Sequence, residues 1–178
     1  MMQDSDVITA RELRFERLLD APVETVWQYL VDPDLRGRWF MGGAIEPWVG
    51  GRIEMVMDHD KLSDGDVPTP ERFAPYKGNR WHETITLLDP PHRLAFSWEE
   101  GKAGTVTIDL APADDGKTRL VLVHTGLRGP ADARNFGGGW HAHLMVLQTR
   151  LAGRTVPDFW ALHAQSEGHV ADRLGDAA

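Results

Sequence analysis

The pattern of apolar and polar residues predicts that the chain begins with one strand followed by two short helices. Residues 13–19 place Leu, Phe and Leu on one side of an alternating segment, which is typical of a half-buried strand. Asp20 can cap a helix, and apolar residues at helical spacing over 23–30 extend it until Pro33. A second helix is expected over 33–40, and the first ten residues are expected to be a mobile lead-in.

The middle of the chain has the pattern of an antiparallel meander that is interrupted by one long loop. Residues 45–49 and 52–57 flank Gly50-Gly51 and predict a hairpin. Residues 59–79 contain few apolar positions and three prolines, so we expect a loop that serves as a lid or a binding loop. Four further strands, separated by turn residues, are expected over 81–88, 93–98, 105–110 and 119–125.

The longest helical pattern lies near the C-terminus, over residues 131–152, and Gly153 provides a suitable end for it. Its apolar stripe is expected to pack onto the sheet and consists of Phe136, Trp140, Leu144, Leu147 and Leu151. Runs of strands followed by a helix indicate an α+β fold, with a curved sheet of six or seven strands around the long helix. We expect one domain over 1–153 and a tail over 154–178, for which a short docked helix is one of two open alternatives.

Composition and charge exclude several classes of function. The chain has 19 basic and 27 acidic residues, a net charge of −8, which is a poor match for nucleic acid or an anionic membrane. It has no cysteine, so disulfides, thiolate catalysis and cysteine metal sites are excluded. No leader sequence and no apolar run long enough to span a bilayer are recognisable, and we expect a cytoplasmic protein without membrane insertion.

Two histidines are candidates for contact with a cavity between the sheet and the helix. His124 alternates with Leu120 and Leu122 in the last strand, so it is expected to point inward. His143 lies at the edge of the apolar stripe, whereas His141 faces elsewhere. This spacing of two residues does not suit a helical metal site, and no metal or cofactor is expected.

Glu83 is the candidate acidic group of the same cavity. It alternates with Trp81 and Ile85, an apolar set that we assign to the inner face of its strand. A buried carboxylate needs a partner or a raised pKa. A pair of Glu83 with His124 or His143 is therefore one hypothesis for an acid/base unit. The alternative is that Glu83 lies solvated at the edge of the sheet.

Large aromatic side chains are the candidate ligand contacts. They can line a cavity for a flat apolar molecule or simply fill the core. The complete expected ligand-binding set is Trp39, Phe40, Trp81, Glu83, Phe96, Trp98, Val106, Ile108, His124, Trp140, His143, Leu144 and Leu147. The glycines at 137–139 do not form a phosphate loop, because no Lys-Ser/Thr follows, and are expected to let the start of the helix pack closely on the sheet.

Several short stretches occur in the order in which one known superfamily has them. They are Ala21-Pro22-Val23-Glu24-Thr25-Val26-Trp27, Arg38-Trp39-Phe40, Gly50-Gly51-Arg52-Ile53, residues 89–98, residues 118–127 and Gly139-Trp140-His141-Ala142-His143-Leu144. Over residues 12–153 the chain thereby resembles the SRPBCC (START/birch-pollen-allergen-like) superfamily, and within it the group named after the activator of the heat-shock-protein ATPase. The resemblance implies a helix-grip (START-like) fold with a cavity between the long helix and the sheet.

The resemblance does not imply a single activity. Members bind lipids, steroids, polyketides or plant metabolites, and some act as cyclases or aromatases. The leading hypothesis is a protein that holds an apolar or aromatic small molecule in the cavity. A cyclase- or hydrolase-type enzyme that uses His124 and Glu83 is the second, and a chaperone- or regulator-linked interaction domain is the third. The sequence also leaves a homodimer open.

Overall fold

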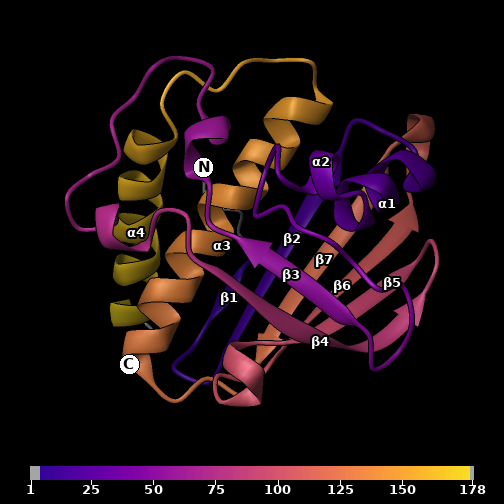
Figure 1. Cartoon of the computed structure of the whole chain (residues 1–178), viewed down its shortest axis with the longest axis horizontal. Coiled ribbons are helices and arrows are strands. Elements are labelled where there is room, and N and C mark those ends of the chain that lie inside the picture. The colour runs from indigo at the N-terminus through magenta and orange to yellow at the C-terminus, as the bar shows by residue number, and fades with distance from the viewer. Residues whose placement is uncertain (1–4, 177–178) are drawn as a thin grey trace.

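The computed structural model describes residues 5–176, which form a seven-stranded antiparallel sheet wrapped around one long helix (Figure 1). The strand order across the sheet is β1-β2-β7-β6-β5-β4-β3. β2 is the predicted first strand, and β3 to β7 form an antiparallel meander, whereas β1 was not predicted. Their bounds are β1 Val7–Ile8, β2 Glu12–Leu19, β3 Arg52–Val56, β4 Arg80–Asp89, β5 Arg93–Ser97, β6 Thr105–Pro112 and β7 Thr118–Thr125.

Four α-helices cover the ends and the concave face of this sheet. Helices α1 (Val23–Val31) and α2 (Pro33–Arg36) lie at one end, and α3 (Pro130–Leu151) crosses the concave face. Helix α4 (Phe159–Asp176) runs beside α3, on the side away from the sheet (Figure 1). Four short 3-10 turns complete the chain, namely η1 His59–Leu62, η2 Ala74–Tyr76, η3 Glu99–Gly101 and η4 Asp114–Gly116. This arrangement is the helix-grip fold that the sequence predicted.

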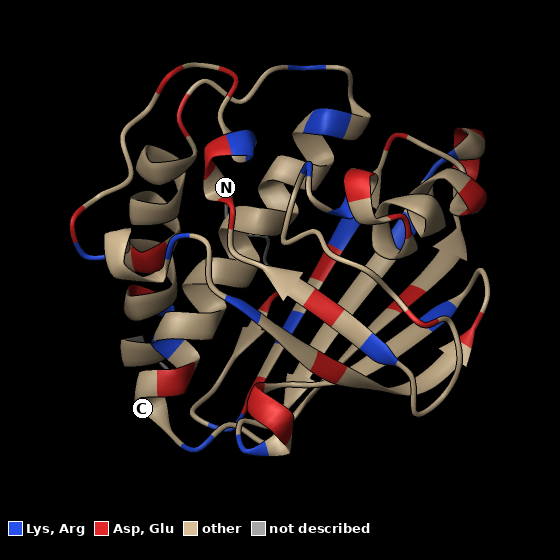
Figure 2. Cartoon of the chain, viewed as in Figure 1, with Lys and Arg blue, Asp and Glu red and all other residues tan. Residues whose placement is uncertain are grey.

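The core lies between α3 and the concave face of the sheet. The predicted stripe supplies Trp140, Leu144 and Leu147, which are buried, whereas Phe136 and Leu151 at its ends are partly buried. Alternate residues of the central strands, such as Phe15, Ile108 and Leu122, are buried against it. Most charges lie on loops and on the outer face of the strands (Figure 2). The period-2 and helical patterns therefore identified the buried faces correctly.

Three expectations for the N-terminal half are wrong. Residues 45–49 form no strand, because Pro47 lacks an N–H and the chain turns tightly after it. In this turn the Gly51 N–H donates to the Trp48 carbonyl. Only isolated bridges, at Gly42 and Ile45, connect this segment to β3. Helix α1 begins after Pro22 without a side-chain cap, so Asp20 is not its cap. The second helix ends at Arg36, with Gly37 as its C-cap, well before Phe40.

The lead-in is also more ordered than expected. β1 pairs with β2, and the buried Asp6 carboxylate forms an ion pair with Arg17 at 2.7 Å. The backbone carbonyl of Asp6 accepts a hydrogen bond from Arg173 in α4, at 3.0 Å. Residues 6–8 are thereby attached to both the sheet and the last helix. The remainder of the expected lead-in, residues 1–4, lies outside the described residues.

The 18-residue helix α4 is much longer than the short helix considered for the tail, and it packs closely along α3. A Cβ on Gly138 would lie 3.2 Å from the Cα of Glu167, and one on Gly137 would lie 2.9 Å from Val170 Cγ1 and 3.2 Å from Leu13 Cδ2. The sequence predicted that these glycines let the start of α3 pack closely on the sheet. Their larger role is to let the backbones of two helices approach.

We expect Gly138→Ala and Gly139→Ala to change stability in opposite directions. The first places a methyl group against the backbone of α4 and should lower the free energy of unfolding by about 1–3 kcal/mol. The second has open space around its Cβ and should raise it by about 0.5–1 kcal/mol through helix propensity. Urea unfolding of both variants measures the difference. Equal effects of the two substitutions would contradict the close α3–α4 contact.

Candidate functional site

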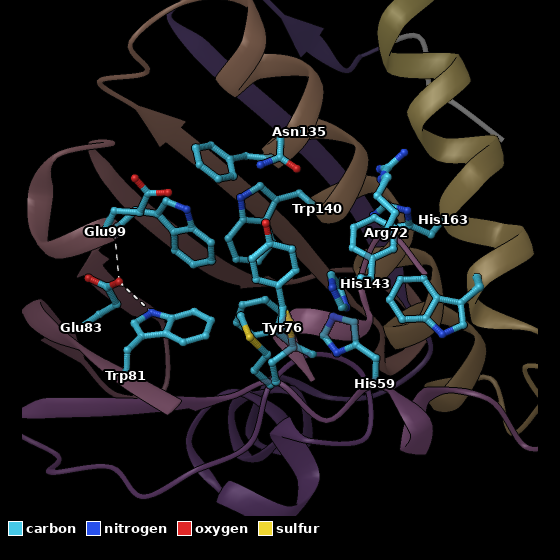
Figure 3. A pocket seen from close by; sticks show the side chains of 18 of the residues that line it. His59, Arg72, Tyr76, Trp81, Glu83, Glu99, Asn135, Trp140, His143 and His163 are labelled. Carbon is cyan, nitrogen blue, oxygen red and sulfur yellow. Dashed lines mark hydrogen bonds between the residues drawn. The ribbon is translucent and has the colours of Figure 1, made fainter. Parts of the chain in front are cut away.

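A pocket of about 710 Å³ lies between α3, the adjoining ends of β4 and β5, the segment that follows β3, and α4. Figure 3 shows Glu83, Glu99 and Trp81 at one end of it, and His59, His143 and His163 at the other. Its lining residues are Phe40, Met41, Met57, His59, Arg72, Phe73, Tyr76, Trp81, Glu83, Trp98, Glu99, Glu100, Lys102, Asn135, Phe136, Gly139, Trp140, His143, Trp160 and His163. Eight of these are Phe, Tyr or Trp and three are His, so eleven of the twenty lining residues carry an aromatic ring.

Three aromatic rings in mutual contact form the inner wall. The ring centre of Trp140 lies 4.9 Å from that of Phe40 and 5.3 Å from that of Trp98. These separations are within the range of favourable aromatic pairs. The Trp140 indole N–H donates to Nδ1 of His124 at 3.1 Å, which fixes the orientation of the indole. The rings therefore present a preformed surface to any occupant.

His124 points inward as predicted, but it lies behind this wall and does not line the pocket. Its Nε2–H donates to the Ala103 carbonyl at 2.8 Å, while Nδ1 accepts from Trp140. Burial lowers the pKa of His124, so the ring is neutral at neutral pH. Both nitrogens are therefore engaged, and the side chain supports Trp140 instead of facing a substrate.

Glu83 is buried, with 1% of its surface exposed, so the interpretation of a solvated edge residue is wrong. Its Oε1 accepts from the Ser97 hydroxyl and the Glu100 N–H, at 2.8 and 2.9 Å. Its Oε2 accepts from the Trp81 indole and the Glu99 N–H, at 3.1 and 2.9 Å. All four donors are close in the sheet or in the η3 turn, and the hypothetical pairs with His124 and His143 are not formed.

These hydrogen bonds give Glu83 a positioning role. Glu99 and Glu100 both have a positive φ, at 49° and 57°, which is costly for residues other than glycine. The carboxylate holds both of their N–H groups and therefore stabilises this strained turn. The same carboxylate orients Trp81, which lines the pocket, so the acidic end of the pocket depends on Glu83 (Figure 3).

The opposite end, which we call the imidazole end, consists of His59, His143 and His163. The ring centre of His59 lies 5.0 Å from that of His143 and 5.6 Å from that of Trp160. Burial lowers the pKa of His59 to about 4, and burial lowers that of His143 well below its usual value. Burial also lowers the pKa of His163. This end of the pocket is therefore rich in neutral imidazoles at neutral pH.

Two segments that carry no strand complete the outer wall. The loop over 59–79 supplies His59, Arg72, Phe73 and Tyr76, and α4 supplies Trp160 and His163. Two contacts hold this loop on α4. The rings of Phe73 and Trp160 stack with their centres 4.8 Å apart, and Arg72 forms an ion pair with Glu167.

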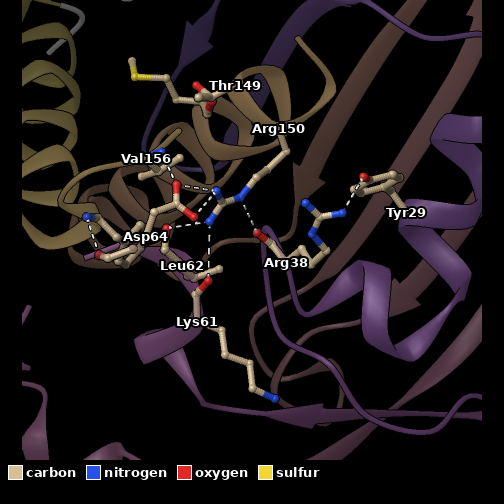
Figure 4. Close-up of polar contacts among 11 residues, drawn as sticks. Tyr29, Arg38, Lys61, Leu62, Asp64, Thr149, Arg150 and Val156 are labelled. Atoms are coloured by element: carbon tan, nitrogen blue, oxygen red, sulfur yellow. Dashed lines mark hydrogen bonds and ion pairs between the residues drawn. The ribbon is translucent and has the colours of Figure 1, made fainter. Parts of the chain in front are cut away.

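In the last turn of α3, Arg150 also contacts the 59–79 loop. Its guanidinium forms an ion pair with Asp64 at 2.7 Å and donates to the Leu62 carbonyl at 3.2 Å (Figure 4). The Asp64 carboxylate in turn accepts from the Val156 N–H, in the segment that leads to α4. One ion pair therefore connects the loop, the end of α3 and the start of the C-terminal extension.

The structure divides the predicted binding set into two groups. Phe40, Trp81, Glu83, Trp98, Trp140 and His143 line the pocket. Trp39, Phe96 and Ile108 border only a small void of about 10 Å³ behind it, and Val106, His124, Leu144 and Leu147 lie in the packed core. Phe40 and Trp140 line both the pocket and the small void, so they separate Trp39, Phe96 and Ile108 from the pocket.

The sequence predicted that the 59–79 loop is a lid or a binding loop, but it did not identify the individual residues of the outer wall. Phe73 and Tyr76 stand in a segment that is otherwise polar, and Trp160 stands in the tail, so each lacks the periodic apolar neighbours that would mark a strand or a core helix. Large aromatic residues inside a polar loop were the available signal.

Residues 5–176 contain neither a membrane-spanning helix nor a cluster of metal ligands. No helix there is long and apolar enough to cross a membrane. In the same residues, no three His, Asp or Glu side chains are grouped so that they could hold a metal ion.

The curved sheet, the gripped helix and the pocket between them define a helix-grip domain. The family model described as activator of Hsp90 ATPase homolog 1-like protein matches residues 20–152, and the chain belongs to this family. Comparison with curated proteins gave no match.

Solved structures show the same fold. The protein encoded by gene BPP1335 from Bordetella parapertussis is 39% identical, with a TM-score of 0.78 over 93% of this chain and 87% of that one. CalU16 from Micromonospora echinospora is 23% identical, with a TM-score of 0.65 over 92% and 88% of the two chains. A protein of unknown function from Enterococcus faecalis, EF2215, is 19% identical, with a TM-score of 0.70 over 98% and 92%. The last two support the fold alone.

We expect Glu83→Gln to destabilise the protein and to change its tryptophan fluorescence. Each carboxylate oxygen accepts two hydrogen bonds, so either orientation of the Gln amide places its NH₂ against two donors. The expected loss in the free energy of unfolding is about 2–3 kcal/mol, measured by urea unfolding. Glu24→Gln, at an exposed position on α1, is the matched control. If the two variants are equally stable, Glu83 does not hold the turn.

Acid should destabilise the fold through its buried histidines. Burial lowers the pKa of His59 and of His141 to about 4, below the unfolded value of about 6.5. The unfolded state therefore binds more protons between these values, and stability is lost as the pH falls through this window. Between about pH 7 and about pH 5, each of these two histidines should cost on the order of 1–2 kcal/mol in urea unfolding.

His141→Asn provides the internal test of this pH dependence. The variant removes one of the buried titrating groups, so the stability difference between the two pH values should shrink by about 1–2 kcal/mol. The control is Gln165→Asn, at an exposed position on α4, which removes no titrating group and should leave the pH dependence unchanged. An unaltered pH dependence in His141→Asn would contradict the assignment.

Proposed function

We propose that this protein binds an apolar, aromatic small molecule in the pocket between α3 and the outer wall. The observation that carries the proposal is a pocket of about 710 Å³ with eight aromatic side chains in its lining. Small-molecule sites are concave, mainly apolar, about 300–1,000 Å³ in volume and contain a few placed polar groups. The imidazoles at one end and the Glu83 cluster at the other are such polar groups.

The two other hypotheses have less support. An acid/base pair of Glu83 and His124 would need them to face a shared substrate, whereas each is saturated by separate hydrogen bonds. A protein-interaction domain would expose a large contiguous apolar patch. The exposed large apolar residues in the described part are Val7, Leu18, Trp48, Val49 and Tyr76, and only Trp48 and Val49 are adjacent in sequence. Binding in the pocket is therefore the preferred function.

Native mass spectrometry together with a thermal-shift screen tests the proposal. We expect either a retained small molecule or a ligand that raises the melting temperature, with a shift that grows with the logarithm of its concentration relative to its Kd, as mass action requires. The screen contains steroids, fatty acids, polyketides and flavonoids. No retained mass and no shift with any of these compounds would contradict the proposal and favour an interaction domain.

A pocket-filling variant locates the binding. Gly139 lines the pocket, and a Cβ there meets no other atom within 4 Å, so Gly139→Leu should fill space without lowering stability. We expect the affinity for a screened ligand to fall at least about tenfold. Gly168→Leu on the exposed face of α4 gains similar helix propensity and should bind normally. Normal binding by Gly139→Leu would place the ligand outside this pocket.

A further inference from the structure

The hydrogen bonding of His143 constrains the chemistry of the ligand. His143 lies on α3 in the pocket wall, with 5% of its surface exposed. Its Nδ1 lies 2.8 Å from the carbonyl oxygen of Trp39. Because a carbonyl can only accept, Nδ1 carries the proton. Burial keeps the ring neutral by lowering its pKa, so Nε2 presents a bare lone pair.

This lone pair is accessible from the pocket. Four buried side-chain atoms of the described residues lack a hydrogen-bond partner, namely Arg36 Nη1, His59 Nδ1, Trp98 Nε1 and His141 Nε2. Nε2 of His143 also forms no hydrogen bond with another described residue, but it is not one of these buried atoms. It is therefore exposed at the pocket surface. It is therefore an open acceptor in a wall that is otherwise mainly aromatic (Figure 3).

We infer that the ligand carries a hydroxyl group on an aromatic ring and that this hydroxyl donates a hydrogen bond to Nε2 of His143. This inference rests on the proposed binding function and names the class of ligand. An apolar group placed over the lone pair would leave a buried acceptor unsatisfied, which is unfavourable. A donor is therefore required at this point of the pocket.

The surroundings distinguish a hydroxyl from charged alternatives. A carboxylate can only accept hydrogen bonds, so its lone pairs would repel the lone pair of Nε2. An ammonium group bound at His143 would share the pocket with Arg72, whose partner is the Glu167 carboxylate, while Glu83 and Glu99 lie at the opposite end (Figure 3). A neutral hydroxyl has neither problem. The rings of Phe40 and His59, with centres 5.1 and 5.0 Å from that of His143, favour an aromatic carrier.

The test compares two probes of nearly the same shape, 2-naphthol and 2-methoxynaphthalene, in titrations followed by tryptophan fluorescence. The wild-type protein should bind 2-naphthol about tenfold more tightly, since only this probe has a donor. His143→Asn keeps a side-chain N–H for the Trp39 carbonyl but removes Nε2. We expect this variant to bind both probes with the lower affinity, and His169→Asn to retain the preference.

Each outcome bears on a separate claim. Equal binding of the two probes by the wild-type protein would overturn the hydroxyl inference and leave the binding function intact. A preference that persists in His143→Asn would overturn the role of His143. If neither probe binds, while other compounds in the screen do, the aromatic hydroxyl class is wrong. If no compound binds at all, the proposed function fails with it.

A spectroscopic measurement tests the inference without relying on a folded variant. Long-range proton–nitrogen correlation of the imidazoles should report the Nδ1–H tautomer for His143 in the free protein. Adding 2-naphthol should shift the Nε2 resonance, and 2-methoxynaphthalene should not. An Nε2–H tautomer, or an Nε2 resonance that responds equally to both probes, would overturn the inference.

Discussion

The close contact between α3 and α4 is the constraint on which the pocket depends. It is possible because Gly137 and Gly138 have no side chains, so that Val170 and Glu167 of α4 lie almost against the backbone of α3. At this separation His141 of α3 lies 2.7 Å from the Ser166 hydroxyl. Trp160 and His163 then lie at the pocket instead of in solvent. Without the glycines the outer wall would stand too far away to enclose a ligand.

The two walls of the pocket therefore have different origins. The inner wall, built from Phe40, Trp98 and Trp140, lies within residues 20–152, the part that the family model matches. Helix α4 lies beyond that part, and it holds the 59–79 loop through the Phe73–Trp160 stack and the Arg72–Glu167 ion pair. The family model thus includes the inner wall and ends before α4 begins. A change in the 59–79 loop or in α4 would alter the outer wall of the pocket and leave the helix-grip core intact.

Much of the fold could be predicted from the sequence, because burial on one face imposes a period on strands and helices alike. The stripe of Trp140, Leu144 and Leu147 is buried, and the meander from β4 to β7 follows the alternating segments. The site was less predictable. Two of the four donors to Glu83 are the N–H groups of Glu99 and Glu100, which have a left-handed conformation for which glycine or asparagine would be the usual signal. Helix α4 has only a weak apolar pattern, and its docking depends on glycines that face it from another helix.

Burial alone does not show whether a polar side chain can interact with a bound molecule. Glu83 and His124 were selected from the sequence because polar residues facing inward need an explanation, and the explanation is local: every hydrogen-bonding atom of both side chains is used. His143 is equally buried but uses only one of its two nitrogens, and the other opens on the pocket. A ligand can gain binding energy only from a group whose hydrogen-bonding capacity is still free. A buried polar group with a free hydrogen-bonding atom, such as Nε2 of His143, is therefore a better candidate for ligand recognition than one whose atoms are all paired.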